Sequence, residues 1–167
     1  MTRRDIIIKW AAYGVMLVLL AAVNYYVLGP IPVPLPLLLP MAAVAVGTLE
    51  GAPFGAGFGI AAGLAMSGLG HTGLGCVPAL SIAGWLSGLV TQYVLRQDVW
   101  GHLICCAATA FLWELWQVLS RLLSHTAPLP VLLHTALPEL LFTLALALPA
   151  YWAGRFCCVH YGRIYHE

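Results

Sequence analysis

The chain has 167 residues, of which 62% are hydrophobic and only 8% are charged, and its formal net charge is +1. Soluble domains carry about 25% charged residues, so this composition excludes a soluble domain and a disordered tail. It also excludes a nucleic-acid binder, which needs a basic patch or stripe. The apolar runs are long and rich in Leu, Ala and Val, without the alternation of barrel strands. We expect an all-α integral membrane protein that forms a single transmembrane domain over residues 1–167.

Six apolar segments are predicted in chain order. The first, at about 6–28, is longer than the apolar core of a signal peptide and is therefore read as an uncleaved span. The proline-rich GPIPVPLP that follows favours an extended conformation over a helix. The remaining segments lie at about 35–49, 52–66, 74–95, 99 to at least 120, and 137–158. A polar connection containing prolines is expected between the last two.

The distribution of basic residues supports six spans. With six spans both termini lie on one side, which then holds all but one of the seven basic residues, namely Arg3, Arg4, Lys9, Arg96, Arg155 and Arg163. Only Arg121 falls on the other side. If the third segment did not span, the split would be four to three. The positive-inside rule therefore predicts that both termini face the cytoplasm.

A ladder of small residues runs through the third segment and recurs in the fourth. Residues four apart share a helix face, and glycines on such a face allow another helix backbone to approach closely. We interpret this ladder as a helix-packing face, either within the bundle or toward a partner protein. Its members are Gly51, Gly55, Gly59, Gly63, Gly84 and Gly88.

The outer end of the fifth segment carries a polar face. Glu114, Gln117 and Arg121 recur at helical spacing, and leucines cover the opposite side. A carboxylate inside a bilayer is costly, so Glu114 must face protein, water or a partner. The alternatives are a docking surface near the outer face of the membrane and a helix end that rises into water.

Little in the sequence points to catalysis, a cofactor or a metal. No H-E-x-x-H or G-x-S-x-G motif occurs, and Glu50 has no second acid near it in the chain. Glu139 follows Pro138 and is expected to cap the first turn of the sixth helix. The cysteines and the outer histidines have no metal-site spacing, and the residues concerned are Cys76, Cys105, Cys106, Cys157, Cys158, His71, His125 and His134.

The order of these features resembles the rod shape-determining protein MreD family of bacteria. The matching features are the basic N-terminus, GPIPVPLPLLLP before the second span, the glycine-rich GAPFGAGFGIAAGLAMSGLGHTGLG, a leucine-rich span ending at Arg96, and a fifth span containing a glutamate. The family often has an aspartate in the glycine-rich stretch, where this chain has Ala65, Met66 and Ser67.

The resemblance implies a non-enzymatic membrane subunit of the cell-elongation complex, which supports cell shape and peptidoglycan synthesis. Its implied partners are the scaffold protein MreC, the actin-like MreB, the glycosyltransferase RodA and a class B penicillin-binding transpeptidase, besides membrane lipids. The implied fold is the six-helix fold of the S components of energy-coupling-factor transporters. The alternative function is therefore that of a vitamin-binding S component, whose ligand groups would include His71, Glu114 and Gln117.

Overall fold

The computed structural model describes residues 3–28, 38–68, 75–95, 98–123 and 129–161, and these residues are almost entirely helical. Three stretches are long and apolar enough to cross a membrane, namely Ile7–Tyr26, Val99–Leu123 and Leu132–Val159. Two shorter apolar helices, Leu38–Glu50 and Ala52–Gly68, accompany them. The expectation of an all-helical fold is confirmed for the described residues, which contain no strand.

The helices follow the predicted order. Helix α1 spans Arg3–Ala22 and continues as a short π-helix, η1, over Val23–Leu28. The other helices are α2 (Leu38–Glu50), α3 (Ala52–Gly68), α4 (Cys76–Tyr93), α5 (Val99–Leu123) and α6 (Leu129–Tyr161). The second, third and fourth apolar segments lie within a few residues of the predicted bounds, while the proline-rich entry to α2 lies outside the described residues.

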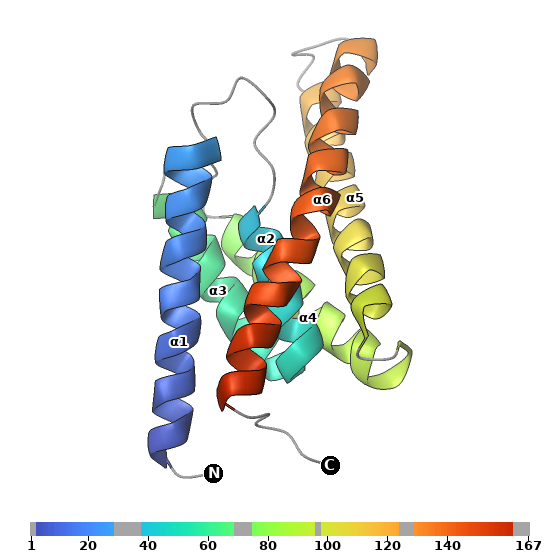
Figure 1. Cartoon of the computed structure of the whole chain (residues 1–167). Coiled ribbons are helices and arrows are strands. Elements are labelled where there is room, and N and C mark those ends of the chain that lie inside the picture. The colour runs from blue at the N-terminus through green and yellow to red at the C-terminus, as the bar shows by residue number, and fades with distance from the viewer. Residues whose placement is uncertain (1–2, 29–37, 69–74, 96–97, 124–128, 162–167) are drawn as a thin grey trace.

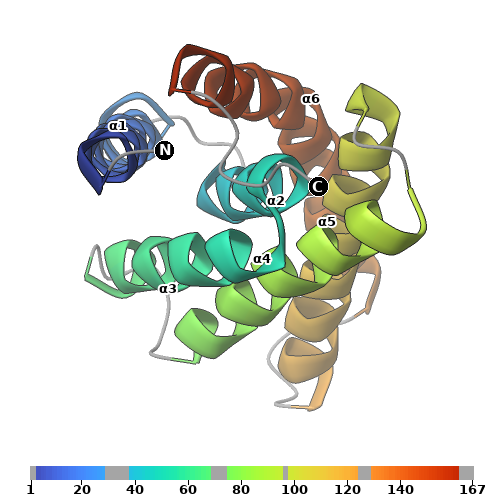
Figure 2. The same ribbon diagram turned by 90° about the horizontal axis from the view of Figure 1, so that it is seen from below.

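Helix α2 is the centre of the bundle. Every residue from Leu38 to Glu50 is buried, and α2 contacts each of α1, α3, α4, α5 and α6. Viewed along the bundle, α2 lies between the α3–α4 pair and α6, with α1 at the edge (Figure 2). A helix that is apolar all round is expected to be surrounded by protein or lipid, and here protein surrounds it.

A single residue joins α2 to α3. Gly51 adopts φ +101°, a backbone conformation that L side chains rarely take. Its amide donates a hydrogen bond of 2.9 Å to the carbonyl of Gly47, and its own carbonyl accepts one of 3.0 Å from Gly55. Gly51 therefore acts as the sharp turn between α2 and α3, unlike the other members of the glycine ladder.

Helix α6 begins at Leu129, which corrects the predicted start near Leu137. Pro138 and Pro149 both lie inside the helix, although proline usually ends one. Prolines are tolerated in membrane helices, where neighbouring groups satisfy the freed carbonyls. Glu139 is consequently interior to α6, so the prediction that it caps the first turn is wrong. His134 lies on α6 for the same reason.

The α5–α6 hairpin projects beyond the other helices. The start of α1 and the end of α6 lie at one end of the molecule, and the end of α5 and start of α6 extend past η1 at the other (Figure 1). At 1.5 Å per residue the 33 residues of α6 measure about 50 Å, against a hydrocarbon thickness of about 30 Å. A helix of this length exceeds the bilayer unless it is strongly tilted.

Candidate functional site

The glycine ladder lies in the contacts among α2, α3 and α4. A Cβ atom on Gly55 would overlap the carbonyl oxygen of Gly84, and one on Gly84 would overlap the carbonyl oxygen of Gly55. Gly47 of α2, which the ladder did not include, meets the same carbonyl of Gly84. Helix α4 therefore touches α3, and at Gly47 also α2, through backbone atoms at this point.

The contact between α3 and α4 continues along both helices. A Cβ on Gly59 would overlap the Leu80 carbonyl, and one on Gly63 would lie 2.6 Å from the Cα of Val77. Gly88 of α4 meets the backbone of Ala52 at the start of α3. These glycines pack within the chain, so their faces are not available to a partner in this arrangement.

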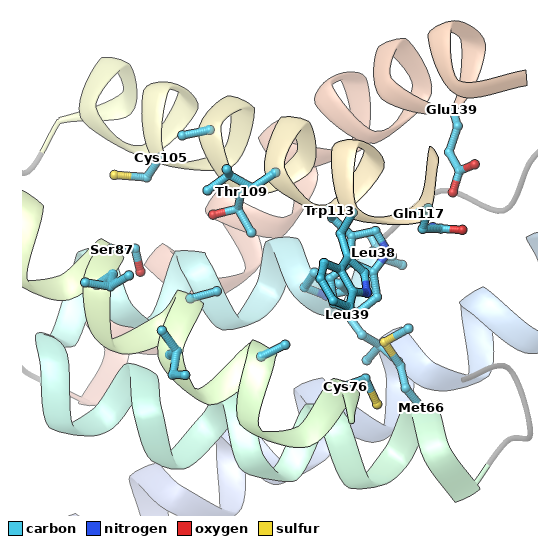
Figure 3. A pocket seen from close by; sticks show the side chains of 18 of the residues that line it. Leu38, Leu39, Met66, Cys76, Ser87, Cys105, Thr109, Trp113, Gln117 and Glu139 are labelled. Atoms are coloured by element: carbon cyan, nitrogen blue, oxygen red, sulfur yellow. The ribbon is translucent and has the colours of Figure 1, made fainter. Parts of the chain in front are cut away.

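A large apolar cavity lies between α4 and α5 and reaches the start of α2 and the end of α3. Its volume is about 1240 Å³. The side chains of Leu38, Leu39 and Trp113 gather at its centre, and Met66 and Cys76 lie along one wall (Figure 3). Helices α4 and α5 separate with distance from the Tyr93–Val99 end where they join (Figure 1). The cavity occupies the space that this separation opens.

One end of the cavity is polar. Gln117 and Arg121 of α5 and Glu139 of α6 line it, and the carboxylate of Glu139 points toward Gln117 in Figure 3. The guanidinium of Arg121 donates a hydrogen bond of 3.1 Å from Nη2 to Gln117 Oε1. The polar face predicted on α5 therefore turns toward α6 and the cavity. Ser124, the next polar residue in the chain, lies outside the described residues.

Glu114 lies inside the α5–α6 contact. It is 7% exposed, and its carboxyl group lies beside that of Glu139 of α6, with the charge of Arg121 close to both. Glu114 therefore faces protein, which is one of the environments expected for a carboxyl group at this depth. Sequence reasoning missed its partner, because Glu139 was assigned to a helix start.

Two acceptor atoms beside the cavity remain unsatisfied. Glu114 Oε1 and Asn24 Oδ1 are buried and have no hydrogen-bond partner among the described residues. Asn24 belongs to η1 and lines the cavity itself. Buried polar groups are nearly always hydrogen bonded, so two orphaned acceptors near one cavity need an explanation.

A buried ion pair at the opposite end of the bundle was not predicted. Lys9 of α1 lies 2.6 Å from Glu50 Oε1, and Tyr13 donates a hydrogen bond of 2.7 Å to the same oxygen. The charge distribution predicts Lys9 among the cytoplasmic basic residues, whereas in the structure its charge is paired with Glu50 inside the protein. The excess of basic residues on the predicted cytoplasmic side then depends on arginines.

A second buried polar group, His102, ties α5 to α2 and α6. His102 is fully buried, with Nε2 3.2 Å from the carbonyl of Ala147 and Nδ1 3.3 Å from the hydroxyl of Thr48. Its ring lies 4.9 Å from that of Tyr151. No sequence pattern indicates this role, since a lone histidine in an apolar run has no periodic partner.

The described residues do not contain three His, Cys, Asp or Glu side chains close enough to hold a metal ion. The cysteines are all buried. His71 and His125, which the S-component alternative and the histidine analysis singled out, lie outside the described residues, and His134 lies on α6.

No family model, no curated protein and no solved structure matches the chain. The function must therefore be argued from the residues and their arrangement.

Proposed function

We propose that this chain is a non-enzymatic membrane subunit of the bacterial cell-elongation complex. The resemblance to the MreD family supports this proposal through the order of its basic N-terminus, proline-rich entry, glycine-rich third helix and glutamate-containing fifth helix. In this proposal each of the six helices makes one crossing of the cytoplasmic membrane. The start of α1 and the end of α6 lie at one end of the molecule, as an even number of crossings requires (Figure 1).

The observation that carries the proposal is the exposed apolar surface of the projecting hairpin. Leu123 is 72% exposed at the end of α5, and other leucines near the same end are also exposed, namely Leu119, Leu122, Leu133 and Leu137. Exposed leucines are ordinary within lipid, but α5 and α6 extend past the other helices here. Apolar surface that leaves the hydrocarbon requires a protein cover. We call these five leucines the hairpin leucines.

A scaffold protein on the outer face of the membrane fits this surface. With both termini cytoplasmic, the hairpin leucines lie on the outer side, which is the side of the periplasmic-facing scaffold MreC. Arg121, exposed beside them, supplies a charge that can orient the partner. RodA, the class B transpeptidase and MreB would belong to the same assembly through other surfaces.

Co-purification with MreC tests this proposal. Replacing Leu123 and Leu133 by alanine should lower recovery of MreC about tenfold, which corresponds to ~1.4 kcal/mol of binding free energy. The matched control replaces Ile104 and Leu148, exposed apolar residues nearer the middle of α5 and α6, by alanine. Equal recovery with both double variants, or no MreC with the parent protein, would contradict the proposal.

The cavity favours a second candidate, the substrate-binding S component of a vitamin transporter. Its volume of about 1240 Å³ would hold a vitamin-sized ligand. Its walls are mainly apolar, however, and polar groups gather at one end only. Compact polar vitamins require polar contacts around their surface, so we favour the scaffold. A stoichiometric vitamin released from the denatured pure protein would reverse this preference.

A further inference from the structure

The orphaned acceptors beside the cavity require hydrogen-bond donors. Glu114 Oε1 and Asn24 Oδ1 are both acceptors, and both are buried without a partner among the described residues. Leaving such atoms unpaired is costly in an apolar environment. Glu139, the neighbour of Glu114, lines the polar end of the cavity, so a molecule that brings N–H groups to that end can donate to its carboxyl group.

The charges at this end select the kind of donor. Glu114 and Glu139 present two carboxyl groups, and the guanidinium of Arg121 is close to both. A ligand with a primary ammonium group can donate to the carboxyl groups, while an anionic group on the same molecule can approach Arg121. The site therefore matches a headgroup with a positive and a negative charge side by side.

The remaining walls of the cavity are apolar and fit the apolar part of a ligand that enters from the membrane. Four apolar side chains line the cavity and are also exposed at the surface of the bundle. They are Ile82 and Leu86 of α4 and Ile104 and Leu112 of α5. The cavity thus opens sideways between α4 and α5. From Ile104 to Arg121 it follows α5 for about 25 Å, most of the hydrocarbon thickness of a bilayer.

We propose that this cavity binds one aminophospholipid of the phosphatidylethanolamine type. Its acyl chains lie between α4 and α5, its ammonium group donates to Glu139, which lies beside Glu114, and its phosphate lies near Arg121. This proposal does not depend on membership of the cell-elongation complex. A soluble amine could supply the same ammonium group, but it would not fill the laterally open apolar part of the cavity.

Native mass spectrometry of the full chain in detergent tests the proposal. The probes are dioleoyl phosphatidylethanolamine, dioleoyl phosphatidylcholine, whose trimethylated nitrogen has no N–H donor, and dioleoyl phosphatidylglycerol. We expect one phosphatidylethanolamine to bind about tenfold more tightly than phosphatidylcholine. The double variant Glu114→Gln, Glu139→Gln should abolish that preference, while Asp98→Asn, at an exposed acid before α5, should retain it.

A second variant tests the apolar part of the cavity independently of the carboxyl pair. Ala83 lines the cavity from α4, and Ala83→Phe should displace the acyl chains and weaken binding of all three lipids. Equal binding of phosphatidylethanolamine and phosphatidylcholine by the parent protein, or a preference for phosphatidylglycerol, would overturn the proposal. Recovery of a tightly bound soluble amine in place of lipid would also overturn it.

Discussion

Lys9 and Glu50 form an ion pair inside the bundle, with 2.6 Å between Nζ and Oε1 and each side chain 1% exposed. The pair joins α1 to the last residue of α2, and Tyr13 donates to the same carboxylate oxygen one turn further along α1. The ring of Trp10 also packs against that of Phe54 of α3, and the ring of Tyr13 meets that of Phe58 edge to face. The ion pair and these rings attach α1 to the rest of the bundle.

Breaking one side of this pair should destabilise the protein strongly. Lys9→Met leaves the Glu50 carboxylate buried without its cation, which costs about 3–5 kcal/mol for buried pairs. The double variant Lys9→Met, Glu50→Gln removes both charges and should recover most of that loss. Thermal unfolding of the purified protein measures both effects. A double variant no more stable than Lys9→Met would show that the two charges are not coupled.

The α3–α4 contact should tolerate no side chain at its glycines. Gly59→Ala places a methyl group against the Leu80 carbonyl and 2.8 Å from the Cα of Ser81, so the helices must separate. Such overpacking costs about 1–3 kcal/mol. Gly14→Ala is the matched control, because a Cβ there meets nothing within 4 Å. Thermal unfolding should show a loss for Gly59→Ala and none for Gly14→Ala, and equal effects would exclude the close contact.

His102 should stabilise the contact of α5 with α2 and α6. His102→Ala removes a fully buried ring and its hydrogen bonds to Ala147 and Thr48, with an expected loss of about 2–4 kcal/mol. The exposed His134 is the matched control, and His134→Ala should change unfolding by less than about 0.5 kcal/mol. Similar stability of the two variants would argue against the interhelical role of His102.

The six-span topology predicts the side from which two positions can be labelled. Leu123→Cys lies at the outer end of α5, and Asp98→Cys lies before its start. A membrane-impermeant maleimide applied to intact spheroplasts should label Leu123→Cys, and it should reach Asp98→Cys only after permeabilisation. The parent protein gives the background, since its cysteines are buried. Outside labelling of Asp98→Cys would reverse the proposed orientation.

The amino-acid sequence by itself determined the helical class and most helix positions. Long apolar runs can only be membrane helices here, because the chain has too few charges to form a soluble surface. The end of the second helix at Glu50 could also be predicted, since Gly51 lies between two apolar segments. In the structure Gly51 adopts the positive φ that glycine permits. The predicted start of α6 is wrong because proline favours the first turn of a helix, whereas Pro138 lies inside α6, as membrane helices permit.

The pairing of distant residues was decided only by the tertiary structure. Tyr13 and Glu50 are 37 positions apart, and no local period links them. The glycine spacing indicated a close helix contact but could not say that α3 meets α4 of its own chain, because small residues permit backbone approach to any partner. The polar end of the cavity likewise required α5 and α6 to place Glu114 beside Glu139, since burial and orientation of a side chain depend on which helices pack together.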